Sequence, residues 1–305
     1  MNLLQLRPNN LKDFLGKNEL KKNLRIYIDK AKQKNHVLDH CLFYGPAGVG
    51  KTSLANIISN EMKVNIKVLQ GPEIQEKNDL LNILYSIKEK DIVFIDEIHA
   101  VNPNSFEMFY SVMEDFKVNI NVGKEFNTKI TSINVPKFTL IGATTKLGNL
   151  PNPFEERFGI ICHIDEYSAD ELFLILKSIC EKISVNLDEE ILKEIANKSK
   201  GIPRLAKRIL ARFIDHYETK KENTDLILKK IGIFNLGLNT TDLNYLMCLA
   251  SKNTLGIKSL SQVLNVDEKT IINKIEPFLI KNNLIEKTSF GRKLTNFGKD
   301  YLEKI

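Results

Sequence analysis

The residues best suited to chemistry form the run 45–52, which reads Gly-Pro-Ala-Gly-Val-Gly-Lys-Thr. This is the G-x-x-x-x-G-K-[ST] pattern of a phosphate-binding loop, whose backbone N–H groups turn inward on a polyphosphate. Glycines such as Gly48 and Gly50 keep side chains out of the way. Lys51 supplies a charge for the β- and γ-phosphates, and the Thr52 hydroxyl is placed to hold Mg²⁺. We therefore predict a nucleotide-binding protein.

A pair of carboxylates follows some forty-five residues later. Asp96 and Glu97 come directly after the apolar run 92–95, so a buried strand delivers both at its carboxyl end. Alone, such a pair would be interpreted as a helix cap. Together with a phosphate-binding loop it indicates the Walker B arrangement, in which Asp96 completes the Mg²⁺ shell and Glu97 polarises the attacking water.

Three further side chains are candidates for contact with the γ-phosphate. The pair Thr144-Thr145 follows another apolar run, and a hydroxyl there could bind the γ-phosphate or the water, although a threonine at a strand end is more often structural. Arg157 precedes the last predicted strand. An arginine that contacts the γ-phosphate bound by a neighbouring subunit raises the turnover rate by a factor on the order of 10³–10⁵. Arg204 opens a predicted helix from which a lid could touch the nucleotide. Without further context Arg157 is more often a surface ion-pair partner, and a nucleotide contact by Arg204 is likewise the less common role for such a residue.

The elements that must position these groups alternate in type. Apolar runs predict strands, and between them lie segments with helical spacing near 18–34, 53–58, 77–88 and 103–114. Alternating strands and helices predict an α/β fold with a mainly parallel sheet covered on both faces. The predicted strands are 41–44, 65–69, 92–95, 138–142 and 160–164.

The segment 117–135 breaks this order. Apolar and polar residues alternate over 118–122 and again over 130–135, with a turn predicted at Gly123-Lys124. The pattern predicts an inserted β-hairpin. It is either an ordinary surface hairpin or an arm that docks onto another protein, and the pattern leaves both open.

After residue 168 the pattern is helical. Helices are predicted at 169–182, 188–199 and 203–217, and a linker at 232–239. Helices near 241–251, 258–265 and 268–282 then precede two short strands joined by a turn at Phe290-Gly291, which is the layout of a winged helix. We predict three domains: a nucleotide-binding domain (1–167), a helical lid (168–238) and a winged-helix DNA-binding domain (239–305).

The composition is that of an ordinary globular protein. The 305 residues are 43% hydrophobic and 27% charged, and the net charge of +6 suits an anionic partner without requiring one. No apolar run approaches a membrane span, and the start lacks the features of a signal peptide. The four cysteines form no C-x-x-C pair. We expect a cytoplasmic protein that is not associated with a membrane.

These elements in this order resemble the AAA+ ATPases, and in detail the RuvB family of ATP-driven Holliday-junction branch migration motors. The resemblance covers nearly the whole chain. Its most specific stretches are Gly-Ala-Thr-Thr at 142–145 and Arg-Phe-Gly-Ile at 157–160. The other matching stretches are 6–8, 39–40, 71–72, 94–99, 113–116, 138–141, 201–204 and 291–292.

The resemblance implies a role for each site residue. Arg157 is the arginine finger that reaches the next subunit, Thr145 the first sensor and Arg204 the second, and these join Lys51, Asp96 and Glu97 as catalytic residues. Thr52 and Asp96 hold Mg²⁺. The implied contacts to ATP are made by Leu6, Arg7, Gly48, Gly50, Lys51, Thr52, Ser53, Glu114, Asp115, Phe116, Arg157, Tyr167 and Arg204.

The resemblance also implies the partners. The chain would form a homo-oligomeric ring, expected to be a hexamer, and its hairpin would bind a RuvA-type junction-binding protein. Lys287 and Arg292 on the wing would contact DNA, namely the duplex arms of a four-way junction, with little sequence preference. Its activity would be that of a DNA helicase or translocase in recombination and in the repair of DNA damage.

The sequence departs from the family pattern at several positions. Lys146 and Lys287 replace arginines, Glu155 replaces a basic residue near the finger, Phe290 replaces an arginine of the wing, and Ala47 stands in place of a second proline. Replacing arginine by lysine keeps the charge but loses bidentate geometry.

Two other functions are alternatives to the motor. One is a winged-helix DNA-binding protein that ATP only switches; the presence of both Glu97 and Arg157 argues against it. The other is an AAA+ ATPase that remodels proteins. Such enzymes thread their substrate past an aromatic loop, whereas the corresponding run 70–74 has no aromatic residue.

Overall fold

The structure is a computed structural model that describes Leu3 and residues 6–122, 129–219 and 223–304. Of residues 120–122, 129–130 and 218–219 it describes the backbone alone. The chain forms two compact units, Met1–Arg208 and Ile209–Ile305.

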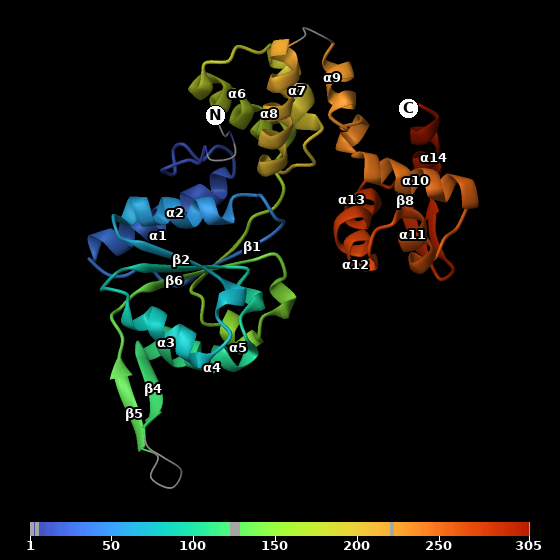
Figure 1. Ribbon diagram of the computed structural model, residues 1–305. Helices are drawn as coiled ribbons and strands as arrows, with labels where there is room; N and C mark the ends of the chain where they lie inside the picture. Colours follow the sequence, from blue (N-terminus) through green and yellow to red (C-terminus); the bar gives the residue numbers. More distant parts are fainter. Residues whose placement is uncertain (1–2, 4–5, 123–128, 220–222, 305) are drawn as a thin grey trace. The chain divides into compact units, whose positions relative to one another are not determined.

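A five-stranded parallel sheet forms the centre of the first unit (Figure 1). Its spatial order is β2-β3-β6-β1-β7, so the strand before the phosphate-binding loop pairs with both β6 and β7. The strands are β1 (Cys41–Tyr44), β2 (Ile66–Gln70), β3 (Ile92–Asp96), β6 (Thr139–Thr144) and β7 (Ile160–His163). The predicted α/β class with a parallel sheet is confirmed.

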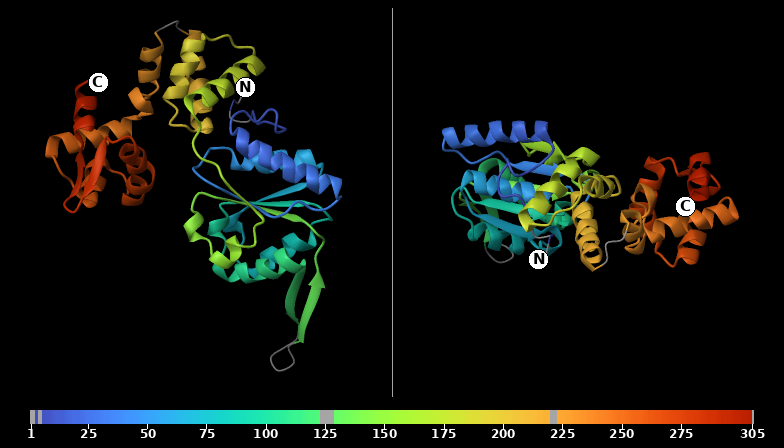
Figure 2. Two further views of the ribbon diagram at one scale, coloured as in Figure 1. Left: turned by 180° about the vertical axis from the view of Figure 1, so that it is seen from behind. Right: turned by 90° about the horizontal axis from the view of Figure 1, so that it is seen from above.

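Helices cover both faces of this sheet, because its central strands are apolar on both sides. The elements on one face are α1 (Asn18–Gln33) and α2 (Lys51–Met62), and those on the other are α3 (Lys77–Tyr85), α4 (Pro103–Asp115) and α5 (Asn152–Glu155) (Figures 1 and 2). On the α4 side, Val93 and Ile95 pack with Phe109, and all three are at most 1% exposed.

The alternating segment forms the antiparallel pair β4 (Lys117–Val122) and β5 (Lys129–Asn134), which projects from the sheet (Figure 1). At its base Val118 is 2% exposed and joins the core beneath α3 and α4. The turn predicted at Gly123-Lys124 lies outside the described residues. The side chains of Ile120, Val122 and Ile130 do so as well.

Helices α6 (Ala169–Ile183) and α7 (Glu189–Asn197) complete the first unit, together with the first residues of α8 (Pro203–Thr219). A capping box fixes the start of α6. The Ser168 hydroxyl accepts a hydrogen bond from the Glu171 N–H at 3.1 Å, and the Glu171 carboxylate accepts one from the Ser168 N–H at 3.0 Å.

The second unit contains a winged helix. Its elements are α9 (Thr224–Lys230), α10 (Thr240–Lys252), α11 (Ile257–Leu264), α12 (Glu268–Thr270), α13 (Glu276–Lys281), β8 (Ile285–Thr288), β9 (Gly291–Leu294) and α14 (Asn296–Glu303). Gly291 has a φ of 139°, and a Cβ there would lie 2.5 Å from the Leu255 carbonyl oxygen. Because Leu255 and Arg292 exchange backbone hydrogen bonds of 3.0 and 2.8 Å, the wing is held against the loop before α11.

The single helix predicted over 268–282 is wrong in one respect. Residues Ile271–Ile275 form a π-helical turn between α12 and α13. Pro277 explains it, because a proline has no N–H to donate and its ring crowds the carbonyl four residues earlier.

No helix in the described ranges is both long and apolar enough to span a membrane.

Candidate functional site

The predicted phosphate-binding loop connects β1 to α2. Gly50 precedes the helix with a φ of 110°, and α2 begins at Lys51. The first N–H groups of a helix have no partner within it, and together with the helix dipole they favour an anion. The loop borders a pocket of about 550 Å³ that lies entirely within the first unit. This volume suits a nucleotide-sized ligand.

Lys51 is held inside this loop. It is 6% exposed, and its Nζ donates to the carbonyl oxygens of Gly45 at 2.8 Å and Pro46 at 2.9 Å. Burial lowers the pKa of Lys51, while Glu97 and Asp96 act in the opposite direction. The ammonium is therefore fixed where the loop would hold phosphates.

Thr52 and Asp96 meet at the carboxyl end of β3. The Thr52 hydroxyl donates to Asp96 Oδ2 over 3.2 Å, although the two residues are 44 apart in sequence. A hydroxyl and a carboxylate oxygen are hard ligands of the kind Mg²⁺ prefers, and such sites are completed by phosphate oxygens and water. The donor set fits the predicted metal.

Glu97 is held beside them by two side chains. It has left-handed backbone angles (φ 49°, ψ 46°), which are uncommon outside glycine and recur at functional sites. Its Oε2 accepts a hydrogen bond from the Thr145 hydroxyl at 3.1 Å. The same oxygen lies 3.2 Å from His99 Nδ1. The structure thus brings the predicted water-polarising carboxylate and the predicted sensor together.

His99 was not singled out from the sequence. Its Nδ1 is also 2.9 Å from the hydroxyl of Thr144, which is fully buried at the end of β6. Burial lowers the pKa of His99, and Glu97 partly opposes this. The only clue to His99 in the sequence is its position two residues after Glu97. Such a position does not distinguish it from the many histidines that lie on protein surfaces.

Other predicted ligands line the same pocket: Leu6, Arg7, Ser53 and Tyr167. Tyr167 is 6% exposed, and its hydroxyl donates to the Val49 carbonyl at 3.1 Å. Burial raises the pKa of Tyr167. Pro8 and Pro203 also line the pocket, and both belong to stretches that match the family. No motif in the sequence pointed to the other lining residues, which include Asp13, Phe14, Leu15, Ile175, Ser178, Ile179, Lys182 and Lys207.

Arg204 reaches the pocket because α8 starts against the phosphate-binding loop. Its N–H donates to the Gly48 carbonyl at 3.3 Å. Gly48 has a φ of 88°, and a Cβ there would lie 2.9 Å from the Arg204 Cβ and 3.0 Å from Ile202 Cγ2. This close approach requires the second glycine of the loop.

Arg157 does not line this pocket. Its Nη2 is 3.1 Å from Glu114 Oε2, its Nη1 donates to the Pro153 carbonyl, and its guanidinium lies 4.6 Å from the centre of the Tyr110 ring. Its side chain is still 25% exposed. These contacts fix the arginine at another edge of the first unit, away from the residues that line the pocket.

Three further predicted nucleotide ligands lie with Arg157 and not in the pocket. Glu114 and Asp115 form the exposed end of α4, and Phe116 follows with its ring 6.1 Å from that of Phe138. The structure therefore does not bring these three residues to the nucleotide pocket of their own chain.

The two basic residues predicted to contact DNA face each other across β8 and β9, and both bind Glu276. Arg292 Nε is 2.7 Å from Glu276 Oε1, and Lys287 Nζ is 2.7 Å from Oε2. The side chains of Lys287 and Arg292 are 46% and 16% exposed, and that of Glu276 is fully buried. Arg292 is thus committed to an internal ion pair, which its sequence context did not indicate.

Known proteins resemble the chain over its whole length. Residues 6–164 match the family model described as the Holliday junction DNA helicase RuvB P-loop domain, 167–236 the RuvB AAA lid domain, and 235–303 the RuvB C-terminal winged helix domain. A Ureaplasma parvum protein named Holliday junction branch migration complex subunit RuvB is 47% identical over 301 residues, covering 98% of this chain and 96% of the relative. Its namesake from Mycoplasma genitalium is 43% identical over 98% of both.

Solved structures of RuvB proteins also resemble this chain. The Thermotoga maritima RuvB Holliday junction branch migration motor matches with a TM-score of 0.84 and 34% identity, covering 99% of this chain and 98% of that one. An ORC2 protein of Aeropyrum pernix, at 15% identity and a TM-score of 0.56, shares only the fold.

Proposed function

The chain belongs to the RuvB family, and from this we propose that it is the ATP-driven subunit of a Holliday junction branch migration complex. It is a P-loop AAA+ ATPase that acts on DNA in recombination and repair. One observation carries the proposal: a single pocket joins the phosphate-binding loop, the Thr52–Asp96 pair and Glu97. A protein that only binds nucleotide does not need a carboxylate held beside the metal ligands.

We propose ATP and Mg²⁺ as the cofactors. Lys51 and the loop N–H groups would bind the phosphates, and Thr52 and Asp96 would hold the metal, which neutralises the developing charge. Glu97 would orient the attacking water, with Thr145 and His99 fixing its carboxylate. Arg204 would bring the lid to the phosphates.

Hydrolysis in this proposal requires a neighbouring subunit. Arg157 lies outside the pocket of its own chain, yet an arginine at the γ-phosphate is worth on the order of 10³–10⁵ in turnover. A ring lets each subunit give Arg157 to the next, with Glu114 and Asp115 at the same seam. We propose a hexamer.

The other partners that we propose are DNA and a RuvA-type protein. We also propose that the protein acts in the cytoplasm. The wing carries exposed basic side chains, Lys287 and Lys293 among them, suited to the phosphates of duplex arms without sequence preference. The hairpin presents a partly buried apolar groove at its base, lined in part by Tyr85, Val118 and Ile133, which suits a protein. We propose the three domains with the boundaries predicted from the sequence.

The test is ATPase activity with and without a four-way DNA junction and a RuvA-type partner. Arg157→Ala should abolish turnover and leave ATP binding intact. Mixing it with Glu97→Gln should restore activity where an intact arginine meets an intact glutamate. No recovery at any mixing ratio would exclude the trans arginine. ATP binding without turnover in the wild type, with every partner present, would favour the ATP-switched DNA-binding protein, and stimulation by an unfolded protein but not by DNA would favour a remodelling ATPase.

A further inference from the structure

The N-terminal segment 6–16, here called the strap, borders the nucleotide pocket twice. Residues 6–8 line the pocket, residues 9–12 leave it, and residues 13–15 line it again. The strap brings mainly apolar side chains, such as those of Pro8 and Phe14, whereas the phosphate-binding groups belong to the loop and α2. Its chemistry therefore suits the nucleoside part of the ligand.

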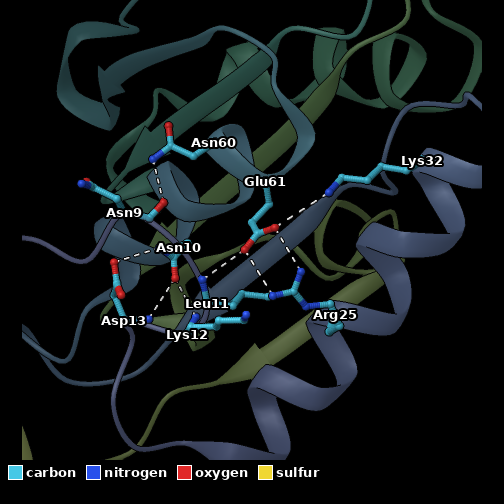
Figure 3. Close-up of polar contacts among 9 residues, drawn as sticks. All are labelled: Asn9, Asn10, Leu11, Lys12, Asp13, Arg25, Lys32, Asn60 and Glu61. Atoms are coloured by element: carbon cyan, nitrogen blue, oxygen red, sulfur yellow. Dashed lines mark hydrogen bonds and ion pairs between the residues drawn. The ribbon is translucent and has the colours of Figure 1, made fainter.

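The residues between these two contacts are fixed to the far end of α2 (Figure 3). Glu61 Oε1 accepts a hydrogen bond from the Leu11 N–H at 3.2 Å. Asn60 Nδ2 donates to the Asn9 carbonyl at 2.9 Å. Because α2 starts at Lys51, one helix carries the phosphate-binding lysine at its first residue and both strap anchors near its last.

The Glu61 carboxylate is itself held by α1. Arg25 Nη1 lies 3.1 Å from Oε2 and Arg25 Nη2 lies 3.3 Å from Oε1, a bidentate pair (Figure 3). Lys32 Nζ is 3.8 Å from Oε2. The Glu61 side chain is only 13% exposed. Two cations and a backbone N–H therefore fix the orientation of this carboxylate more firmly than a surface side chain would allow.

The strap continues from this anchor in a defined direction. Asn10 Oδ1 accepts hydrogen bonds from the N–H groups of Lys12 at 2.9 Å and Asp13 at 3.0 Å, which turns the chain back to the pocket (Figure 3). Phe14 is 5% exposed there, beside Gly50. The lid holds the chain at both sides of the strap. Lys207 donates to the carbonyl of Leu6, the first residue of the strap, and Glu171 accepts a hydrogen bond from the N–H of Lys17, the residue that follows it.

We propose that Glu61 is a positioning residue for the nucleotide: by holding Leu11, it sets residues 6–8 and 13–15 against the nucleoside part. The inference rests on the proposed function, because it assumes that this pocket binds ATP. Glu61 touches no ligand itself. Loosening it weakens the grip on the nucleoside and leaves the phosphate-binding groups in place.

The experiment compares two ligands on the full chain, ATP and inorganic tripolyphosphate, both with Mg²⁺, by calorimetric titration. For Glu61→Gln the dissociation constant of ATP should rise roughly tenfold, since a charge-assisted anchor is lost. That of tripolyphosphate should not change. The Michaelis constant should rise with kcat preserved at saturating ATP.

Two variants make the result specific. Asn60→Ala removes the bond to Asn9 without touching the contacts of Glu61 with α1, and it should shift the two ligands in the same unequal way. Glu19→Gln, on the exposed part of α1 with a side chain that is 83% exposed, should change neither. If Glu61→Gln does not fold, Arg25→Gln decides the question in the same titrations, because it removes the bidentate partner that orients the Glu61 carboxylate.

Equal weakening of both ligands by these variants, or no weakening of either, would overturn the role of Glu61. A wild-type chain that binds neither ligand would instead contradict the proposed function.

Discussion

Arg292→Ala should destabilise the winged helix, which is a different result from a simple loss of DNA affinity. Glu276 is fully buried, and its oxygens are bound by Arg292 at 2.7 Å, Lys287 at 2.7 Å and the Tyr245 hydroxyl at 3.1 Å. Removing Arg292 leaves a buried carboxylate with one exposed cation and one hydroxyl.

The expected size follows from this burial. Breaking one partner out of a buried ion pair costs about 3–5 kcal/mol, because the remaining charge is left desolvated. Lys287→Ala should cost no more than about 1 kcal/mol, since the Lys287 side chain is 46% exposed and Arg292 stays in place. The double variant Arg292→Ala/Glu276→Gln should recover part of the loss, because a buried neutral amide costs less than a buried charge.

Hydrogen exchange of the full chain measures this locally, through the backbone amides of β8, β9 and α10. At about 1.4 kcal/mol per factor of ten, Arg292→Ala should speed their exchange by roughly two to four orders of magnitude. Amides of the central sheet in the first unit provide an internal control. For Lys287→Ala we expect nearly unchanged exchange and a log–log salt slope of DNA binding that is flatter by about one charge.

Low pH should also destabilise the winged helix, through protonation of Glu276. Burial by itself raises the pKa of Glu276, but hydrogen bonds from Arg292 and Lys287 outweigh it, and the pKa lies below its ordinary value. A carboxyl whose pKa is lowered by folding stabilises the protein above its unfolded pKa, and this stabilisation is lost as the pH falls through the folded pKa. Protection of β8 and β9 should therefore fall below about pH 4.3 in the wild type. In the Arg292→Ala variant, the protection of β8 and β9 should depend much less on pH in this range.

One result would refute this reasoning. If Arg292→Ala left the exchange of β8 and β9 unchanged and flattened the salt slope by about one charge on unrelated DNA sequences, Arg292 would be a DNA contact and not a structural ion-pair partner.

Two further predictions concern the first unit. His99→Ala should lower kcat and leave the dissociation constant of ATP unchanged in titrations, since His99 Nδ1 lies 3.2 Å from the Glu97 carboxylate; a rise in that constant with kcat preserved would contradict the role. Ile133→Asp should weaken binding of a RuvA-type partner at least tenfold while basal ATPase persists, as is typical of a central apolar contact. Ser132→Asp, on the opposite face of β5, is the matched control, and equal affinity of the two variants would exclude docking through this face.

Much of the site was predictable because its residues sit at positions that local rules define. A parallel sheet aligns the carboxyl ends of its strands, so Asp96 after one apolar run and Thr145 after another had to approach the loop between β1 and α2. The glycine spacing determined that loop, and caps such as the pair of Ser168 and Glu171 determined where helices begin. Periodicity gave the hairpin and the wing in the same way.

Contacts between charged residues distant in sequence were decided only by the tertiary structure. Glu61 and Glu276 look like the many glutamates on exposed helices, because no spacing shows which carboxylate the fold will bury or which arginine will meet it. The helical pattern over 268–282 predicted one continuous helix, because a π-helical turn depends on how the neighbouring turns pack. The sequence alone therefore determined which chemistry the chain carries. Packing determined that Arg157 lies outside its own pocket, that Arg292 serves an internal ion pair, that His99 contacts Glu97, and that Glu61 anchors Leu11, since burial and distance are properties of the folded chain.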